Sequence, residues 1–225
     1  MGNSPNSSSE PHAPRWRRRK EARPAELIAA ALDLFAERGF AGTKIEDVAS
    51  RAGVTKGTVY LYFGSKEALL EAVVRETIVS EIERAERHVD EYTGSARELL
   101  VSYLRHWWHA VGETKLAAIA KLMMAESASF PDLAAFYVGE VVQRGRRLLA
   151  RILERGVASG EFRPVDVPQA VRVVLAPLLH ASMWRQSFFQ CEQMPLDVEA
   201  YLRTHVDLLM HGITAPAHED DTDHA

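Results

Sequence analysis

Hydrophobic residues recur at helical spacing along most of the chain. In the first such stretch Leu27, Ala31, Leu34 and Phe35 stand at positions i, i+4, i+7 and i+8, which places them on one face of a helix. No run in which polar and apolar residues alternate between turn signals is present, so we expect no sheet. The pattern therefore predicts an all-helical protein.

Start and stop signals divide this pattern into about nine helices. Pro24 can occupy the first turn of the first helix, and Gly39 marks its end. Capping boxes that begin at Thr43 and Ser95 mark the starts of two others. Pro177 falls inside a later helix and should kink it. The predicted helices span about residues 24–39, 44–52, 55–63, 65–88, 95–111, 114–127, 131–160, 168–189 and 197–210.

Residues 45–63, IEDVASRAGVTKGTVYLYF, fit two short helices joined by a tight turn. Helices that cross steeply need a small residue where they touch, which Ala49 supplies, and the turn needs the positive φ that Gly53 tolerates. Val59 then faces back to a core that the helix at 24–39 can close. This spacing predicts a helix-turn-helix unit.

The outward side of the second helix carries hydroxyls and an amine, which bond to phosphates and base edges, and a glycine that lets the duplex approach. Thr43 and Ser65, each at a helix N-terminus, offer N–H groups to a phosphate, and Lys66 adds charge. A plain three-helix packing unit with a polar outer face is the alternative. The DNA-binding candidates are Thr43, Lys44, Thr55, Lys56, Gly57, Thr58, Tyr60, Tyr62 and Lys66.

The net charge of −4 argues against a nucleic-acid partner until it is divided along the chain. Residues 1–66 hold 11 lysines and arginines against 7 acidic residues, whereas residues 67–225 hold 16 against 24. The basic excess peaks between Arg15 and Arg23. Such asymmetry indicates a basic end that faces a polyanion, although a solvated tail or an address signal would also produce it.

The stretch from Ile28 to Leu70, which contains AALDLFAERGFAGTKIEDVASRAGVTKGTVYLYFGSKEALL, closely resembles the DNA-binding domain of the TetR/AcrR family of bacterial transcriptional regulators. The resemblance implies a homodimeric, all-helical protein in which the N-terminal helices bind DNA and a larger, variable domain binds an inducer and dimerises. It implies phosphate contacts from Thr43, Tyr62 and Lys66, and base or groove contacts from Thr55, Lys56, Thr58 and Tyr60. A minor-groove contact from the basic leader is a further hypothesis.

These observations divide the chain into four segments. We expect a flexible basic leader at 1–20, a helix-turn-helix DNA-binding domain at 21–81 with its motif at 44–63, a helical ligand-binding and dimerisation domain at 82–212, and a disordered acidic tail at 213–225. In the second domain, KLMMAESASFPDLAAFYVGEVVQRGRRLLARIL resembles the C-terminal domains of one AcrR-like subgroup, a likeness that fixes no ligand.

Large apolar side chains are plentiful in this second domain. Trp and Met suit an apolar pocket between helices, with a few polar groups for orientation. A helical bundle also needs many of these side chains merely as core, and the polar candidates can equally be surface or satisfied core residues. The ligand-binding candidates are Trp107, Trp108, His109, Met123, Glu126, Phe130, Tyr137, His180, Trp184 and Phe188.

The helices at 168–190 and 197–212 carry residues at helical spacing that predict a four-helix dimer interface, although half of them can belong to the core of one subunit. A twofold dimer also suits a palindromic operator, whose half-sites lie one turn, about 34 Å, apart. The positions are Val171, Val174, Leu175, Leu178, Leu179 and Ser182 in the first helix, and Val198, Tyr201, Leu202, Val206, Leu208 and Leu209 in the second.

Other classes of protein have less support. A single cysteine, Cys191, excludes a disulfide framework and a cysteine-based zinc site. His106 and His109 alone are too few for a metal, and no enzyme motif is present, so we expect no catalysis, no metal and no cofactor. The longest uncharged apolar run, residues 173–184, is too short to cross a bilayer, and no apolar region follows the basic cluster. We therefore expect a cytoplasmic protein with no membrane partner.

Together these features predict a ligand-responsive repressor that binds a palindromic DNA operator as a homodimer and is released by a small apolar or amphipathic ligand. We expect the ligand to enter the C-terminal bundle and shift the helix that starts at Ser65, which joins the recognition helix through Phe63 and Gly64. A ligand-independent architectural or cell-cycle factor of the same fold is the alternative, which a filled C-terminal domain would favour. An enzyme of unknown class is a second rival, which turnover or a bound metal would favour.

Overall fold

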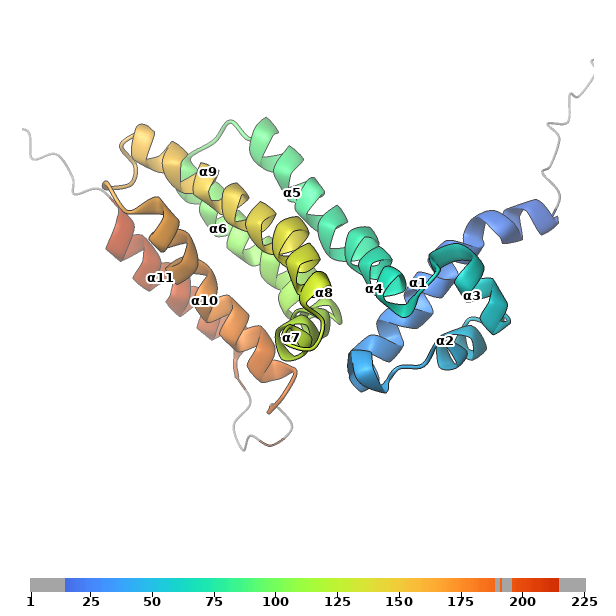
Figure 1. Ribbon diagram of the computed structural model, residues 1–225. Helices are drawn as coiled ribbons and strands as arrows, with labels where there is room; N and C mark the ends of the chain where they lie inside the picture. The colour runs from blue at the N-terminus through green and yellow to red at the C-terminus, as the bar shows by residue number, and fades with distance from the viewer. Residues whose placement is uncertain (1–14, 189–190, 192–195, 215–225) are drawn as a thin grey trace, which may run out of the picture.

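The computed structural model describes residues 15–188, 191 and 196–214, and its helices form two parts that lie side by side (Figure 1). Within these residues the regular elements are helices, and one isolated antiparallel bridge joins Phe162 to Thr214. The all-helical fold class is therefore confirmed. None of the described helices is long and apolar enough to span a membrane.

Four helices form one end of the molecule, which we call the head. α1 packs against α2 and α4, and α3 follows α2 after a tight turn. The head helices are α1 (Arg15–Gly42), α2 (Ile45–Arg51), α3 (Lys56–Phe63) and α4 (Lys66–Val74).

The first helix starts earlier than the sequence predicts. α1 begins at Arg15, and Pro24 lies inside it rather than in its first turn. The residues between them are mostly Arg, Lys, Glu and Ala, which are good helix formers. Residues 15–20 thus belong to a helix and not to a flexible leader, whereas 1–14 and 215–225 lie outside the described residues. Gly39, with φ 73°, breaks the helical geometry where the sequence places the stop, and one more turn follows.

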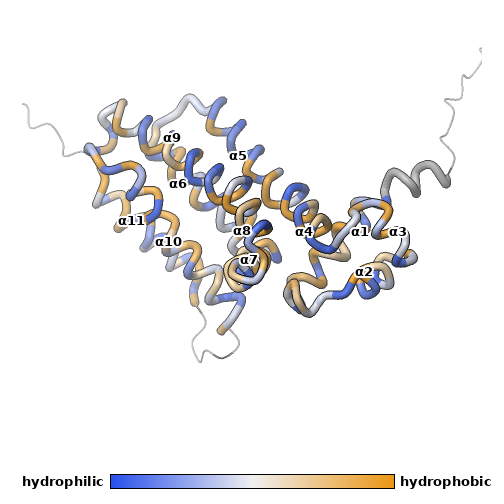
Figure 2. The backbone as a smooth tube through the Cα atoms, viewed as in Figure 1, coloured by the Kyte–Doolittle hydropathy of each residue, from blue (hydrophilic) through white to orange (hydrophobic). Residues whose placement is uncertain are grey.

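The remaining described helices form the other part, which we call the body. Hydrophilic and hydrophobic residues alternate along α5 and α9 (Figure 2), as expected of helices that bury one face. The body helices are α5 (Ser80–Glu91), α6 (Ala96–Trp107), α7 (Leu116–Glu126), α8 (Pro131–Tyr137), α9 (Arg144–Ala158), α10 (Val167–Arg185) and α11 (Val198–Ile213).

Three π-helical turns join or extend these helices in the described part of the chain. η1 (Arg75–Val79) joins α4 to α5, η2 (Trp108–Gly112) extends α6, and η3 (Val138–Gln143) joins α8 to α9. Because the chain stays helical through η1 and η3, residues 66–91 and 131–158 each form one rod, close to the predicted spans. Counted in this way, the described residues form nine helices, as predicted.

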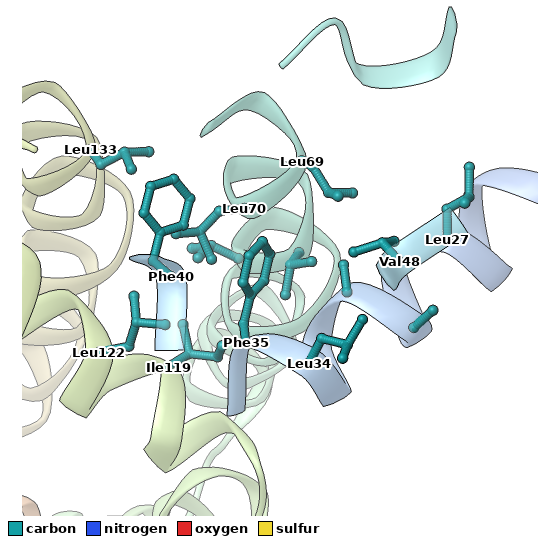
Figure 3. Packing of buried hydrophobic residues seen from close by; sticks show 14 of the residues in the cluster. Leu27, Leu34, Phe35, Phe40, Val48, Leu69, Leu70, Ile119, Leu122 and Leu133 are labelled. Carbon is teal, nitrogen blue, oxygen red and sulfur yellow. The ribbon is translucent and has the colours of Figure 1, made fainter. Parts of the chain in front are cut away.

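The hydrophobic core of the head continues into the body. Phe40, fully buried near the end of α1, packs among side chains of α4, α7 and α8 (Figure 3). Its ring meets that of Phe130 edge-on, with centroids 4.8 Å apart. Asp33 and Lys115 form an ion pair at 2.5 Å between the same two parts. We call this shared contact the seam, and it means that a movement in α7 or α8 reaches the head through packed side chains. The residues that define the seam are Phe40, Ile119, Leu122, Phe130 and Leu133.

A second cluster of buried residues lies wholly in the body, among α5, α6, α9, α10 and α11. Trp108 is its largest fully buried side chain, and Leu149 of α9 and Leu178 of α10 belong to the same cluster. The N-cap that the sequence predicts for α6 is present, because the hydroxyl of Ser95 accepts a hydrogen bond from the amide of Glu98 at 3.1 Å. The Glu98 carboxylate does not complete a capping box; it accepts a hydrogen bond from the Tyr92 hydroxyl instead.

Candidate nucleic-acid interface and ligand cavity

The turn between α2 and α3 has the predicted geometry. Ala49 and Val59 are buried where the two helices touch, with 3% and 1% of their surface exposed. Gly53 has φ 64°, and the amide of Val54 closes the turn by donating to the carbonyl of Ala49 at 2.9 Å. The hydroxyl of Thr55 caps α3 by accepting from the amide of Thr58 at 3.3 Å. The turn therefore holds α3 with one face outwards.

Most of the predicted DNA-binding residues lie on this open face. Along α3 and its N-cap they present two threonine hydroxyls, the ammonium of Lys56, the uncovered backbone of a glycine and two phenol rings, and Lys44 adds a second ammonium just before α2. Lys44, Thr55, Lys56, Gly57 and Tyr60 are exposed, whereas Thr58 and Tyr62 are half-buried.

One side chain on this face was missed by sequence reasoning. Leu61 is 82% exposed, the largest value among the exposed large hydrophobic residues described. It stands two residues after Val59, which points into the core, and so lies on nearly the opposite side of the helix. The spacing from Val59 could have shown that Leu61 faces outwards. Because leucine is apolar, it was not included among the candidates for DNA binding. A leucine there can contact the methyl group of thymine in a major groove.

Lys56 is held in place before any DNA arrives. Its ammonium forms an ion pair with Glu46 of α2 at 2.5 Å and lies 5.7 Å from the centroid of the Tyr60 ring. The hydrogen bond from Lys56 lowers the pKa of Glu46, and the same bond raises the pKa of Lys56, so both groups stay charged near neutral pH. The ion pair crosses the turn between α2 and α3 and fixes the position of the Lys56 ammonium.

Further ion pairs tie the acidic residues of the head to its own arginines. Arg51 donates to both carboxylate oxygens of Glu37, at 2.7 and 3.0 Å, and Arg38 pairs with Asp47 at 3.1 Å. The hydrogen bond from Arg51 lowers the pKa of Glu37. These contacts join α1 to α2, so the acidic groups nearest the outer face have partners within the protein.

The structure corrects the predicted role of Thr43. Its side chain is 1% exposed, and its hydroxyl donates to the carbonyls of Leu34 at 3.1 Å and Gly39 at 2.7 Å. The hydroxyl therefore does not cap α2, and its proton is already donated within α1. Lys44 is the N-cap residue of α2, without a side-chain cap.

Lys66 also differs from its predicted role. Its ammonium donates to the carbonyls of Phe40 at 2.9 Å and Thr43 at 3.1 Å, and lies 4.3 Å from the centroid of the Phe40 ring. Two of its three protons are thus used inside the head. Ser65 caps α4 as predicted, by accepting from the amide of Ala68 at 3.0 Å. This lysine fastens the end of α1 to the start of α4, and its charge is only partly available to DNA.

The body contains a cavity of about 480 Å³ between α5, α6, α7, α9 and α10. Its walls are largely apolar side chains, such as Ile82 of α5, Trp107 of α6 and Leu175 of α10. Each of the three π-helical turns also contributes, through Ile78 of η1, Val111 of η2 and Val141 of η3. Such turns are frequent at functional sites, because the extra residue reshapes a helix face. An apolar cavity of this size suits a small ligand.

Only two of the ten predicted ligand-binding residues, Trp107 and Tyr137, line this cavity. Trp108 and Met123 are buried in the two cores, and Phe130 belongs to the seam. His109 is exposed and bonded to Glu113 at 2.8 Å.

The predicted residues of α10 lie outside the cavity as well. His180 stacks on Trp184 along the exposed side of this helix, and the ring of Phe188, in the turn after α10, is tilted against Trp184; the centroids are 5.7 and 4.9 Å apart. Glu126, in the last turn of α7, is likewise not among the lining residues. Residue size drew attention to these positions, whereas the rotation of each helix decides which side chains face the cavity.

The cavity carries a few polar groups among its apolar walls. Glu81 and His106 lie 3.8 Å apart on one side, and Glu81 is also paired with Arg84. Arg146 of α9 and Arg172 of α10 line it too, together with the phenol rings of Tyr103 and Tyr137. Burial raises the pKa of both tyrosines, so they remain hydrogen-bond donors at neutral pH. In the described residues, no three His, Cys, Asp or Glu side chains are grouped so as to hold a metal ion.

Comparisons with known proteins agree with this geometry. Residues 27–73 match the family model described as bacterial regulatory proteins, tetR family, and residues 90–190 match the model described as Tetracyclin repressor-like, C-terminal domain. The fatty acid metabolism regulator protein of Bacillus subtilis is 28% identical over 199 residues, which cover 86% of this chain and 98% of that protein. The HTH-type transcriptional repressor KstR2 of Mycolicibacterium smegmatis is 29% identical over 191 residues, covering 84% and 89%.

The fold is shared with a solved structure as well. The transcriptional regulator FadR from Bacillus subtilis, in complex with stearoyl-CoA, superposes with a TM-score of 0.69 at 27% identity, covering 84% of this chain and 98% of that one. The first family model covers most of the helix-turn-helix head, and the second covers the cavity-lining residues from Tyr103 to Leu179 but not those of η1 and α5. The chain is therefore a DNA-binding transcriptional regulator of the TetR family.

Proposed function

We propose that the protein is a repressor that binds a palindromic operator as a homodimer and releases it when an amphipathic effector fills the cavity. The observation that carries this proposal is the position of η1. This turn forms part of the cavity wall through Ile78, and it is continuous with α4, the helix that packs on α3. A ligand in the cavity therefore touches the same rod that holds the reading helix.

The seam offers a second route from the cavity to the head. Tyr137 lines the cavity at the end of α8, and its neighbour Phe136 lies under the guanidinium of Arg75 of η1, 4.6 Å from ring centroid to carbon. At the other end of α8, Phe130 meets Phe40 of α1. A shift of α8 would thus move both η1 and α1. For this to release DNA, the ligand must bind more tightly to the released state than to the operator-bound one.

On the DNA, we assign the contacts to the open face of α3 and the residue before α2. The set is that of the sequence prediction without Thr43, with Leu61 added and with Lys66 in a lesser role. It comprises Lys44, Thr55, Lys56, Gly57, Thr58, Tyr60, Leu61 and Tyr62.

The dimer is proposed to form through the outer faces of α10 and α11. Of the predicted interface positions, Val171, Val174, Leu178, Ser182 and Leu202 are buried within one subunit, which matches the expectation that half belong to its core. The same two helices and the turn after α10 leave several large apolar side chains exposed, and exposed apolar patches mark interfaces. They are Val173 at 68%, Trp184 at 36%, Phe188 at 53% and Leu208 at 68%; Leu179, at 39%, is also exposed but lines the cavity.

The relatives support an effector with a long hydrocarbon part. One is a fatty acid metabolism regulator, and the FadR structure holds stearoyl-CoA. The apolar walls of the cavity fit an acyl chain. A body with a filled interior would have favoured a ligand-independent factor, so the cavity supports the ligand-responsive alternative.

The test measures operator binding with and without effector. Genomic fragments retained by the full chain, including the DNA that flanks its own coding region, supply the operator, and fluorescence anisotropy gives its affinity. We expect long-chain acyl-CoA, with stearoyl-CoA as the first probe, to weaken operator binding at least tenfold. Undiminished binding across short, medium and long acyl-CoAs and the free acids would overturn the proposed response.

A cavity-filling variant separates response from binding. Gly145 lines the cavity, and a Cβ there would meet no atom within 4 Å, so Gly145→Phe can place a ring in the cavity. We expect this variant to bind the operator as tightly as the parent and to ignore acyl-CoA. Gly139→Phe is the matched control, because a Cβ there is equally free and Gly139 does not line the cavity. A Gly145→Phe protein that still responds would place the effector elsewhere.

A further inference from the structure

Arg146 differs from three other arginines of α9 in having no partner among the described residues, and it differs from the exposed Arg147 in being half-buried against the cavity. Arg144 pairs with Glu86 at 2.7 Å, Arg151 pairs with Asp90, and Arg155 donates to the carbonyl of Tyr92 at 2.7 Å. Arg146 is half-buried and lines the cavity, yet within the described part of the chain it has no hydrogen bond, ion pair or ring contact. A partly buried guanidinium without an acceptor is unfavourable unless something outside the chain supplies one.

Arg172 repeats this situation on the facing helix. α9 and α10 pack against each other, and Arg172 lines the same cavity from α10. It is exposed, so the cavity reaches the surface beside it, and it too lacks a partner among the described residues. The acidic group of the cavity, Glu81, is already neutralised by Arg84. The cavity therefore holds two uncompensated positive charges at the edge of an apolar interior.

A third unpartnered group lies deeper. Tyr103 of α6 is 7% exposed and lines the cavity, and within the described residues its hydroxyl has no hydrogen-bond partner. This hydroxyl is not among the fully buried polar atoms that lack a partner, so it is accessible from the cavity and can donate to a molecule that enters it. A ligand oxygen in the cavity would satisfy this donor.

We propose that the effector is an amphiphile with an anionic head, bound by Arg146 and Arg172, and that the hydroxyl of Tyr103 donates to an uncharged oxygen in the body of the ligand. This inference rests on the proposed function in taking the cavity as the effector site. Guanidinium groups bind carboxylate and phosphate oxygens in a bidentate manner, so the head is a carboxylate or a phosphate. Neutral lipids and quaternary ammonium amphiphiles are excluded, because they leave both charges unpaired.

Direct binding to the full chain tests the head group without reference to DNA. Isothermal titration compares hexadecanoate, hexadecanoyl-CoA, methyl hexadecanoate and hexadecyltrimethylammonium, each below its micelle concentration. We expect one or both anionic probes to bind at least tenfold more tightly than the ester and the cation. Hexadecanoate alone would identify a carboxylate head, and hexadecanoyl-CoA alone a phosphate head. Equal binding of the ester and the anions would overturn the inference.

Variants locate the charge. We expect Arg146→Gln and Arg172→Gln each to lower the affinity for the preferred anion about tenfold, the loss typical of a charge-assisted hydrogen bond, and to leave binding of the ester unchanged. Arg147→Gln is the matched control, since Arg147 is the exposed neighbour of Arg146 and does not line the cavity. Affinities that fall equally in the control, or that do not fall in either variant, would contradict the assignment.

The tyrosine has its own readout. Tyr103→Phe should weaken hexadecanoyl-CoA several-fold, because its thioester oxygen loses a donor, and should leave hexadecyl phosphate unaffected. Equal loss with both probes would show that the ring merely packs, and would overturn the role of the hydroxyl. Operator binding measured with and without the anion separates the two proposals. If the anion binds as expected but the operator is never released, the proposed response fails while the anion site stands.

Discussion

The head and the body build their binding surfaces in opposite ways. The outer face of α3 comes from one short motif, and its leading cation, Lys56, is already paired with Glu46 across a single turn. The cavity is walled by side chains from Ile78 to Leu179, and its cations at 146 and 172 have no partner within the described residues. The leading cation of the head is thus positioned by a partner within the protein before DNA binds. The two cavity cations of the body have no such partner in the described part of the chain and are available to a ligand. The seam between them decides whether they act as one unit.

The largest expected effect is at the seam. Phe40→Ala removes a fully buried ring that contacts Phe130 and the ammonium of Lys66, so we expect a loss of about 3–5 kcal/mol in the free energy of unfolding. Urea unfolding followed by tryptophan fluorescence measures it, because Trp107 and Trp108 report on the body. If the shared core couples the two parts, a mutation in α1 will move the transition seen in the body.

Leu61→Ala is the control for this experiment, since Leu61 is 82% exposed and its removal should change stability by less than about 0.5 kcal/mol. The opposite result would be that the Phe40→Ala head unfolds at a lower urea concentration while the unfolding transition of the body is unchanged. It would mean that head and body fold separately and that the seam transmits little.

The same contrast explains how far the sequence could predict the molecule. The helix-turn-helix follows from Ala49, Gly53 and Val59, whose spacing is local, and the structure places all three as expected. The capping role predicted for Thr43 was wrong, because its hydroxyl donates to the carbonyls of Leu34 and Gly39 in α1. A capping pattern cannot reveal such tertiary competition.

The cavity was harder to predict for a related reason. Trp107 faces it and Trp108 does not; Met124 lines it and Met123 is core. Neighbours on a helix differ by about 100° in direction, so a small error in helix rotation exchanges wall for core. The π-helical turns change the rotation of the helices further, and the pattern of hydrophobic residues did not predict these turns. The walls come from segments far apart in sequence, which a single chain without packing information does not bring together.

Substitutions of one glycine in the head and one in the body should give smaller losses of stability, for different physical reasons. In the head, Gly53 has φ 64° and open space around a notional Cβ, so it serves the backbone. In the body, a Cβ at Gly156 would fall 2.0 Å from the ring of Phe162, so it serves packing. We expect Gly156→Ala to cost about 1–3 kcal/mol by overpacking and Gly53→Ala about 1–2 kcal/mol by backbone strain. Thermal or urea unfolding measures both.

Rescue distinguishes the two causes. Gly53→Asn should recover part of the lost stability, because asparagine tolerates the left-handed region better than alanine. The double variant Gly156→Ala with Phe162→Leu should recover part of the other loss by making room. Failure of each rescue in its own part would mean that the division between backbone and packing roles is wrong.

The next largest expected effect is on operator affinity and not on effector affinity. Lys56→Ala should weaken operator binding by about 1–2 kcal/mol and leave effector affinity unchanged, because it removes a cation from the open face of α3. Anisotropy titrations at several salt concentrations measure both the affinity and its salt slope. Lys121→Ala is a suitable control, since that lysine lies in the body and bonds to the carbonyl of Gln186. An unchanged operator affinity in Lys56→Ala would remove this residue from the interface.

The smallest expected effect concerns a carboxylate of the body. Glu161 accepts hydrogen bonds from the amides of Ala96 at 2.9 Å and Arg97 at 3.1 Å, at the N-terminus of α6, and these bonds lower its pKa from the ordinary 4.5. A lowered folded pKa means that the stabilisation is complete above the unfolded value and is lost as pH falls through the folded one. Since the carboxylate is largely in contact with water, we expect only about 0.5–1 kcal/mol.

Glu161→Gln should therefore lower stability near neutral pH, and the difference from the parent should shrink as the pH falls below 4.5. Urea midpoints across this range measure it, with Glu154→Gln, an exposed position on α9, as the control. A difference that stays constant with pH would mean that the carboxylate contributes through packing and not through its charge. The start of α6 would then be held by the two amide hydrogen bonds and by packing, in contrast to the Lys56–Glu46 pair that spans the turn of the head.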